Sequence, residues 1–118
     1  TACSWLVPQR LGQARALGLA LTGNKLPAAK AAEWGLIWEA VADEAFATAV
    51  DGLARQLAAM PTRALVRTRQ AMQAGRSNTL EQQLTLEGLY MRELGRSRDY
   101  VEGVAAFLEK RPPHFTGA

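Results

Sequence analysis

The sequence contains one cysteine and one histidine, and this scarcity excludes several kinds of chemistry. With Cys3 alone, the chain cannot form an internal disulfide or a thiolate metal cluster. We interpret Cys3 as a small buried hydrophobic residue, with a thiol activated at a helix N-terminus as the alternative. Any Ser-His-Asp arrangement would need His114, which follows two prolines in the C-terminal tail. No carboxylates are spaced as in a calcium loop, so no metal is expected.

Long apolar runs, blocks of like charge and glycine-rich phosphate loops are also missing. No run approaches membrane-spanning length, and no charged-then-apolar signal segment opens the chain, so we expect no membrane partner. The lone cysteine, which allows no internal disulfide, favours a cytoplasmic location. The net charge of +3 is spread along the chain. Nucleic-acid binding usually needs a clustered basic stripe, so no nucleic-acid partner is expected either.

What the sequence does contain is helical periodicity. Apolar residues recur at helical spacing between glycine and proline signals, which predicts a mainly α-helical chain. A helical chain of 118 residues is small, so we expect it to need a partner to cover its apolar faces. The predicted helices cover residues 2–11, with Pro8 kinking or ending the turn, then 13–22, 28–34, 43–60, 62–74, a helix from 79, and a last one ending before 112.

One segment breaks the helical pattern. Residues 36–41 form a compact apolar run without a helical start or stop, which makes this the one place where a short strand is plausible. Such a strand would need a pairing partner, because a lone strand is not stable. The prediction is therefore at most one short strand near 36–41.

The last two helices carry the clearest local signals. A capping-box pattern, formed by Asn78 with Glu81 or by Thr79 with Gln82, marks the start of the helix predicted from residue 79. That helix has apolar residues on two neighbouring sides, which is typical of an interface between subunits or domains. Ser97 or Asp99 can cap the final helix. After it, the tail has little apolar content and is expected to be anchored by its one phenylalanine.

Three stretches resemble the crotonase (enoyl-CoA hydratase/isomerase) superfamily. Residues 16–41 read ALGLALTGNKLPAAKAAEWGLIWEAV, like the family's helix ending in Leu-Thr-Gly, its Ala-rich helix and its Gly-Leu-Val/Ile turn. Residues 61–72 resemble the family's Pro-x-x-Ala-Leu helix. Residues 99–117 read DYVEGVAAFLEKRPPHFTG, like the family ending Glu-Gly-x-x-Ala-Phe-x-Glu-Lys-Arg-x-Pro-x-Phe.

The resemblance implies a fold and a division of the chain. It identifies the chain as the C-terminal helical segment of a crotonase-like fold. Residues 1–41 would form the end of the spiral core and its linking helices, and residues 42–118 a helical trimerisation and CoA-binding domain. The Trp-Gly-Leu-Ile-Trp and Gly-Arg-Ser-x-Asp-Tyr stretches are most similar to the phenylacetate-catabolism branch, whose enzyme isomerises ring-epoxidised phenylacetyl-CoA. An ordinary enoyl-CoA hydratase is the alternative.

The family pattern also implies which site residues are present. Lys110 matches a lysine that reaches a CoA phosphate of a neighbouring subunit. A family aromatic that packs on adenine aligns near Met91, with Tyr90 beside it. Trp34 and Trp38 are candidates for the acyl pocket without support from a motif. Coenzyme A would be part of the substrate, and no separate cofactor is implied.

The resemblance assigns no catalytic residue to this chain. The family's oxyanion hole and proton-transferring carboxylate would lie before Thr1, because the pattern Pro-Asp-x-Gly-Gly-Thr-Trp aligns on Trp5. Ala2-Cys3-Ser4 stands where Gly-Gly-Thr is usual. The chain alone is therefore expected to be inactive, and to assemble as a trimer or dimer of trimers. The alternative function is a non-catalytic helical oligomerisation or interaction module.

Overall fold

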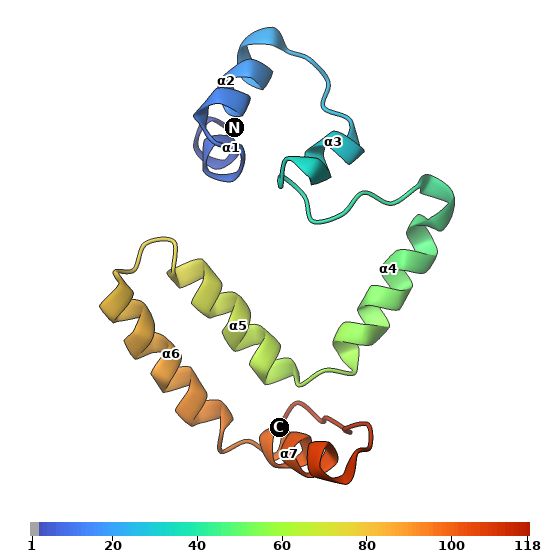
Figure 1. Ribbon diagram of the computed structural model, residues 1–118, viewed down its shortest axis with the longest axis vertical. Coiled ribbons are helices and arrows are strands. Elements are labelled where there is room, and N and C mark those ends of the chain that lie inside the picture. Colours follow the sequence, from blue (N-terminus) through green and yellow to red (C-terminus); the bar gives the residue numbers. More distant parts are fainter. Residues whose placement is uncertain (1–2) are drawn as a thin grey trace. The chain divides into compact units, whose positions relative to one another are not determined.

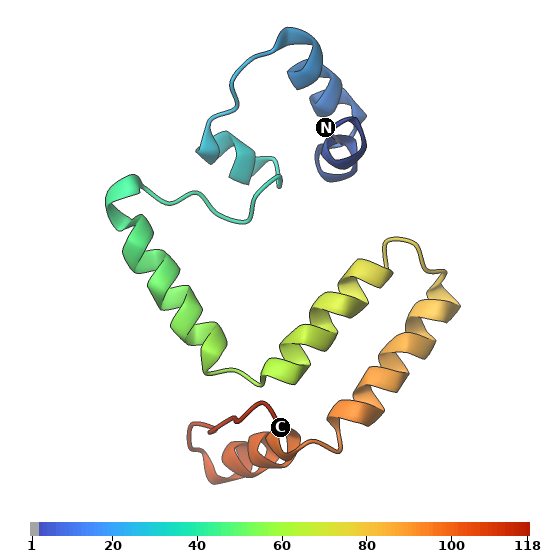
Figure 2. The same cartoon turned by 180° about the vertical axis from the view of Figure 1, so that it is seen from behind.

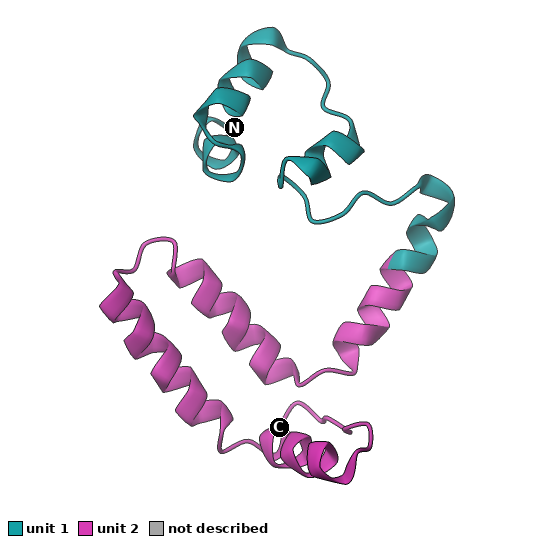
Figure 3. Ribbon diagram, in the orientation of Figure 1, with its two compact units in different colours: residues 1–49 teal, residues 50–118 magenta. Residues whose placement is uncertain are grey.

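The computed structural model describes residues 3–118 and confirms the mainly helical prediction (Figures 1 and 2). Across this range the regular elements are helices, joined by short turns and loops. The bounds are α1 Cys3–Leu11, α2 Gln13–Thr22, α3 Ala28–Glu33, α4 Asp43–Ala58, α5 Thr62–Ala74, α6 Leu80–Leu94 and α7 Arg98–Glu109. The chain forms two compact units, residues 1–49 and residues 50–118, and the boundary between them falls inside α4 (Figure 3).

In the first unit, helices α1 and α2 pack against each other. Pro8 lies inside α1 without ending it, and its carbonyl accepts a hydrogen bond from the Gly12 N–H at 2.9 Å. Gly12 has a φ of 78°, a conformation that glycine adopts without steric cost, so the chain can turn sharply between the two helices. Leu11 and Ala16 are buried at this junction. The glycine therefore sets the α1–α2 pairing.

The strand considered for residues 36–41 does not form. Helix α3 ends in a turn where Gly35 has a φ of 78° and the Leu36 N–H returns to the Ala31 carbonyl at 2.9 Å. The residues that follow bend and then continue without regular structure to the start of α4. The physical reason is that a strand needs a neighbouring strand for its backbone groups, and none lies in the described part of the chain.

The second unit is built around the antiparallel pair α5 and α6, which lie side by side in both views (Figures 1 and 2). Thr79 and Gln82 form the predicted capping box, with Thr79 Oγ1 accepting the Gln82 N–H at 3.3 Å. Gln83 joins the helices by donating from Nε2 to the Ala71 carbonyl at 3.1 Å. The capping box and this cross-helix hydrogen bond fix where α6 starts relative to α5.

Helix α7 and the tail complete the second unit. Ser97 is the residue that caps α7, accepting the Tyr100 N–H at 3.1 Å and donating to the Leu94 carbonyl at 2.6 Å. Asp99, the other predicted cap, lies inside the helix. The tail then folds back along α7, as Figure 1 shows at the red end of the chain.

Candidate functional site

The turn that ends α7 contains Lys110, the residue matched to the family's phosphate-binding lysine. Its backbone is left-handed, with φ 55° and ψ 37°, and it is the one non-glycine residue with a positive φ in the part of the chain that the structure describes. The Lys110 N–H bonds to the Ala106 and Phe107 carbonyls, and the Arg111 N–H also returns to Ala106 at 3.1 Å. This double closure is a Schellman turn, whose left-handed position is usually taken by glycine.

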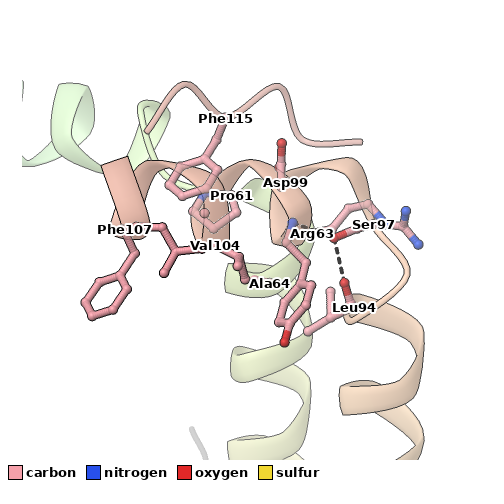
Figure 4. Close-up of a pocket in the computed structure, with 12 residues that line it drawn as sticks. Pro61, Arg63, Ala64, Leu94, Ser97, Asp99, Val104, Phe107 and Phe115 are labelled. Carbon is pink, nitrogen blue, oxygen red and sulfur yellow. Dashed lines mark hydrogen bonds between the residues drawn. The ribbon is translucent and has the colours of Figure 1, made fainter. Parts of the chain in front are cut away.

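The Lys110 side chain is exposed beside an aromatic ring. Its Nζ lies 4.6 Å from the centroid of the Phe107 ring, within the range of a cation–π contact. Phe107 itself is 71% exposed and points away from Phe115 in Figure 4. A cation and an aromatic face are thus presented together on the surface of α7.

Glu102 holds the chain immediately after this turn. Its two carboxylate oxygens accept from the Arg111 guanidinium at 2.6 and 2.9 Å, and Oε1 also accepts the His114 N–H at 2.8 Å. These hydrogen bonds from Arg111, and then from His114, lower the pKa of Glu102 to about 2. The Arg111 pKa is raised, first by Glu102 and then by Glu109, which accepts from Arg111 Nε at 2.6 Å. The ion pair is therefore charged at every ordinary pH.

Asp99 holds the tail one helical turn earlier. This carboxylate is buried, and it accepts the Thr116 N–H at 2.8 Å, the Thr116 hydroxyl at 3.3 Å and the Gly117 N–H at 2.9 Å. Phe115 lies against Gly103, where an added Cβ would come within 3.5 Å of the ring. Phe115 thus anchors the tail as predicted, and the carboxylates of Asp99 and Glu102 accept the hydrogen bonds that the tail donates.

A hollow of about 380 Å³ lies beneath this tail, between α7, the start of α5 and the end of α6 (Figure 4). Its lining is mostly apolar. The residues around it include Pro61, Ala64, Leu94, Val104, Leu108 and Phe115.

Tyr90 and Met91 line a second hollow of about 380 Å³ between α5 and α6. One face of the Tyr90 ring is covered by the Arg67 guanidinium, which lies 4.9 Å from the ring centroid. Arg67 is held in turn by Glu93, with Nη2 2.8 Å from a carboxylate oxygen, and Glu93 also pairs with Arg63. The pKa of Glu93 is lowered, first by Arg67 and then by Arg63. Met91 is 74% exposed, so it is the more available of the two candidate adenine contacts.

Trp34 and Trp38 belong to the first unit and differ in their surroundings. Two cations lie over the Trp34 ring, with Arg15 Cζ at 5.1 Å and Lys30 Nζ at 5.7 Å from its centroid. Arg15 also donates a long hydrogen bond of 3.5 Å to the Trp34 carbonyl. Trp38 is 80% exposed. Only Trp38 therefore offers most of its surface to a ligand.

The scarce reactive residues do not gather into a catalytic or metal-binding set. Cys3 is exposed, which corrects the expectation of a buried hydrophobic residue. Over residues 3–118, His, Cys, Asp and Glu side chains form no group that could hold a metal ion. Among the helices of residues 3–118, none combines the length and the apolar character that spanning a bilayer requires.

Two residues that matter here were missed by sequence reasoning. Glu102 was part of the quoted ending but had no role assigned, and Asp99 was treated only as a possible cap. A signal existed, because two carboxylates three residues apart lie on one face of a helix, and the tail that follows carries an arginine and free backbone N–H groups.

Comparison with known proteins identifies the class of this chain. It matches the enoyl-CoA hydratase/isomerase family over residues 1–118. The 1,2-epoxyphenylacetyl-CoA isomerase of Escherichia coli is 54% identical over 97% of the chain, and a probable enoyl-CoA hydratase of Rhodobacter capsulatus is 50% identical over 97%. A solved enoyl-CoA hydratase structure from Geobacillus kaustophilus superposes with a TM-score of 0.92 at 30% identity, covering 99% of the chain.

The chain therefore belongs to the enoyl-CoA hydratase/isomerase family, the crotonase superfamily, as the three sequence stretches indicated. It spans 44% of the length of each of the two sequence relatives and 44% of the Geobacillus chain.

Proposed function

We propose that this chain is part of an acyl-CoA isomerase or hydratase acting on a ring-epoxidised phenylacetyl-CoA or an enoyl-CoA thioester. The observation that carries the proposal is the 54% identity to the Escherichia coli 1,2-epoxyphenylacetyl-CoA isomerase, which extends over nearly the whole chain. The ring-epoxide substrate is preferred over a simple enoyl-CoA because of this relative. The proposed location is the cytoplasm, and coenzyme A enters as part of the substrate.

The role of this part of the enzyme, in our proposal, is to bind coenzyme A and to support assembly. Reaction at an acyl-CoA thioester needs backbone N–H donors for the enolate oxygen and a carboxylate to move protons. Three of the chain's carboxylates are already engaged: Glu93 and Glu102 bind arginines, and Asp99 binds the tail. We assign proton transfer to none of these three carboxylates.

Lys110 is the proposed contact to a CoA phosphate. Its ammonium is exposed at the end of α7, where an anionic ligand can reach it. Tyr90 and Met91 are the proposed adenine contacts, and the cover that Arg67 gives Tyr90 favours Met91. Trp34 and Trp38 are proposed for the acyl pocket, with Trp38 the more accessible.

Assembly as a trimer, or a dimer of trimers, is proposed from the exposed apolar side chains. Helix α6 exposes residues on more than one side, and α7 exposes a further row. Apolar surface of this extent on neighbouring helices is typical of subunit interfaces. The residues concerned are Leu80, Leu84, Leu89 and Met91 on α6, and Val101, Val104, Phe107 and Leu108 on α7.

One experiment tests the enzymatic proposal against the alternative of a non-catalytic helical module. The protein, expressed as its natural gene encodes it, is assayed with ring-epoxidised phenylacetyl-CoA and with crotonyl-CoA. Turnover of the epoxide substrate supports the isomerase, and turnover of crotonyl-CoA alone points to a hydratase. Absence of turnover with both, together with a stable oligomer in light scattering, would establish the module instead.

A further inference from the structure

The left-handed conformation of Lys110 calls for a physical explanation. At this position of a Schellman turn glycine fits without penalty, whereas a side chain crowds the following carbonyl. Lysine therefore gives the turn no advantage over glycine. A residue kept in a disfavoured backbone conformation is held there by its surroundings and often has a functional side chain.

Backbone hydrogen bonds close the turn at Lys110, and Glu102 binds the chain that leaves it. Arg111 directly follows Lys110. Its Nη1 and Nη2 atoms donate hydrogen bonds to the two Glu102 carboxylate oxygens, at 2.6 and 2.9 Å. The His114 N–H is bound by the same group at 2.8 Å. The chain leaving Lys110 is thus tied back to α7 on its next residue and again three residues later, which fixes the direction of the turn.

We infer that Glu102 is a positioning residue for Lys110. By binding Arg111 and the His114 N–H, it keeps Lys110 left-handed with its ammonium beside Phe107, so that the cation is in place before an anionic ligand arrives. A group fixed in its bound position loses less conformational freedom on binding, and affinity rises accordingly. The inference rests on the proposed function, in which that ligand is a phosphate of coenzyme A.

The first test compares two variants that change the charge equally. Glu102→Gln removes the charged bidentate pair with Arg111, and we expect the Kd for coenzyme A to rise roughly tenfold. Glu109→Gln also removes a carboxylate bonded to Arg111, at 2.6 Å, but leaves Glu102 in place. We expect its Kd to change by less than about twofold. Isothermal titration calorimetry with coenzyme A on the protein as its gene encodes it measures both.

A double-mutant cycle separates positioning from a direct effect. If Glu102 acts through Lys110, then Glu102→Gln added to Lys110→Ala should weaken binding no further, because the cation it positions is already gone. Independent, additive losses would overturn the inference. In the active protein, positioning also predicts a raised KM with kcat retained, whereas general damage to the fold would lower both.

Two further variants guard against misfolding and separate the two hypotheses. Arg111→Lys keeps the charge but loses the bidentate geometry, so we expect an intermediate loss of affinity in a folded protein. Lys110→Gly should bind as weakly as Lys110→Ala yet unfold at a higher temperature, since glycine relieves the backbone strain. If Lys110→Ala leaves the Kd unchanged, the proposed phosphate contact fails. If Lys110→Ala weakens binding and Glu102→Gln does not, only the positioning role fails.

Discussion

The two units of this chain differ in how the chain reverses direction after a helix. In residues 1–49 the reversals occur at Gly12, Gly23 and Gly35, which all have positive φ and close their turns with backbone hydrogen bonds. In residues 50–118 the last reversal occurs at Lys110, which also closes its turn with backbone hydrogen bonds, and carboxylates on α7 additionally hold the returning chain. Glycine adopts a positive φ without steric strain, whereas charged contacts allow a residue with a side chain to remain at such a turn.

This difference follows the proposed functions of the two units. A turn whose only task is to connect helices can use glycine. A turn that must present a cation needs a side chain at the strained position and contacts elsewhere that offset the strain. The predictions below test this contrast, beginning with the largest effect.

Removing the Asp99 carboxylate should have the largest effect on stability. Asp99→Ala leaves the Thr116 and Gly117 N–H groups without their acceptor, and we expect a loss of about 2–4 kcal/mol in the free energy of unfolding. Hydrogen exchange should show that these two amides lose their protection. Asp99→Asn, which retains an acceptor oxygen, should lose less. Unchanged protection in Asp99→Ala would mean that the carboxylate does not hold the tail.

Replacing Gly23 tests the glycine turns of the first unit. Gly23 has a φ of 66° and no other group within 4 Å of an added Cβ, so the cost of Gly23→Ala comes from the backbone alone. We expect a loss of about 1 kcal/mol. Gly18→Ala is the matched control, because it lies inside α2 with equally open space and should gain about 0.5–1 kcal/mol. Thermal unfolding should show opposite signs, and equal signs would contradict the account of this turn.

The cations around Trp34 provide a smaller test in the same unit. Arg15→Met removes the closer cation while keeping an apolar side chain, and we expect a loss of about 0.5–1 kcal/mol. Lys30→Met is the comparison, because Lys30 lies farther from the ring and is also paired with Glu33 at 2.8 Å. A cycle with Trp34→Leu measures the coupling. A coupling of zero for Arg15 would show that the ring contact contributes nothing.

Of these predictions, the titration of Glu102 should have the smallest effect on stability near neutral pH. Its pKa falls to about 2 in the folded protein from an ordinary value of 4.5, so the unfolded chain binds the proton more readily. The ion pair then contributes fully above about 4.5, and the contribution is lost as the pH falls toward 2. Glu102→Gln should flatten the dependence of stability on pH in that window alone. An identical slope in the variant would contradict the lowered pKa.

Sequence reasoning predicted most of the fold because its signals are local. The capping box at Thr79, the glycine ends of α2 and α3, and the helix start after Pro61 each depend on a few adjacent residues, and the structure confirms them. The strand allowed at residues 36–41 does not form, and the expectation of a buried Cys3 was wrong, because both depended on groups distant in the chain. Pairing and burial are properties of neighbours in space, which local patterns do not record.

The candidate site shows the same division. Lys110, Tyr90 and Met91 came from a family pattern, whereas Trp34 and Trp38 had no motif behind them. The roles of all five remain predictions. The structure added the state of each side chain, most clearly the cover of Arg67 over Tyr90. It also brought Glu102 together with Arg111 across the end of a helix, a contact between residues nine positions apart.

The sequence by itself determined the helices, their ends and the family, since these depend on local periodicity, capping and a pattern of residues along the chain. Only the tertiary structure decided that Lys110 takes a left-handed turn and that two carboxylates of α7 hold the tail. The physical reason is that backbone hydrogen bonds close this turn, while contacts from Arg111 and His114 to Glu102 hold the chain that leaves it. No local pattern favours a lysine in that conformation, so its stability depends on where the chain goes afterwards.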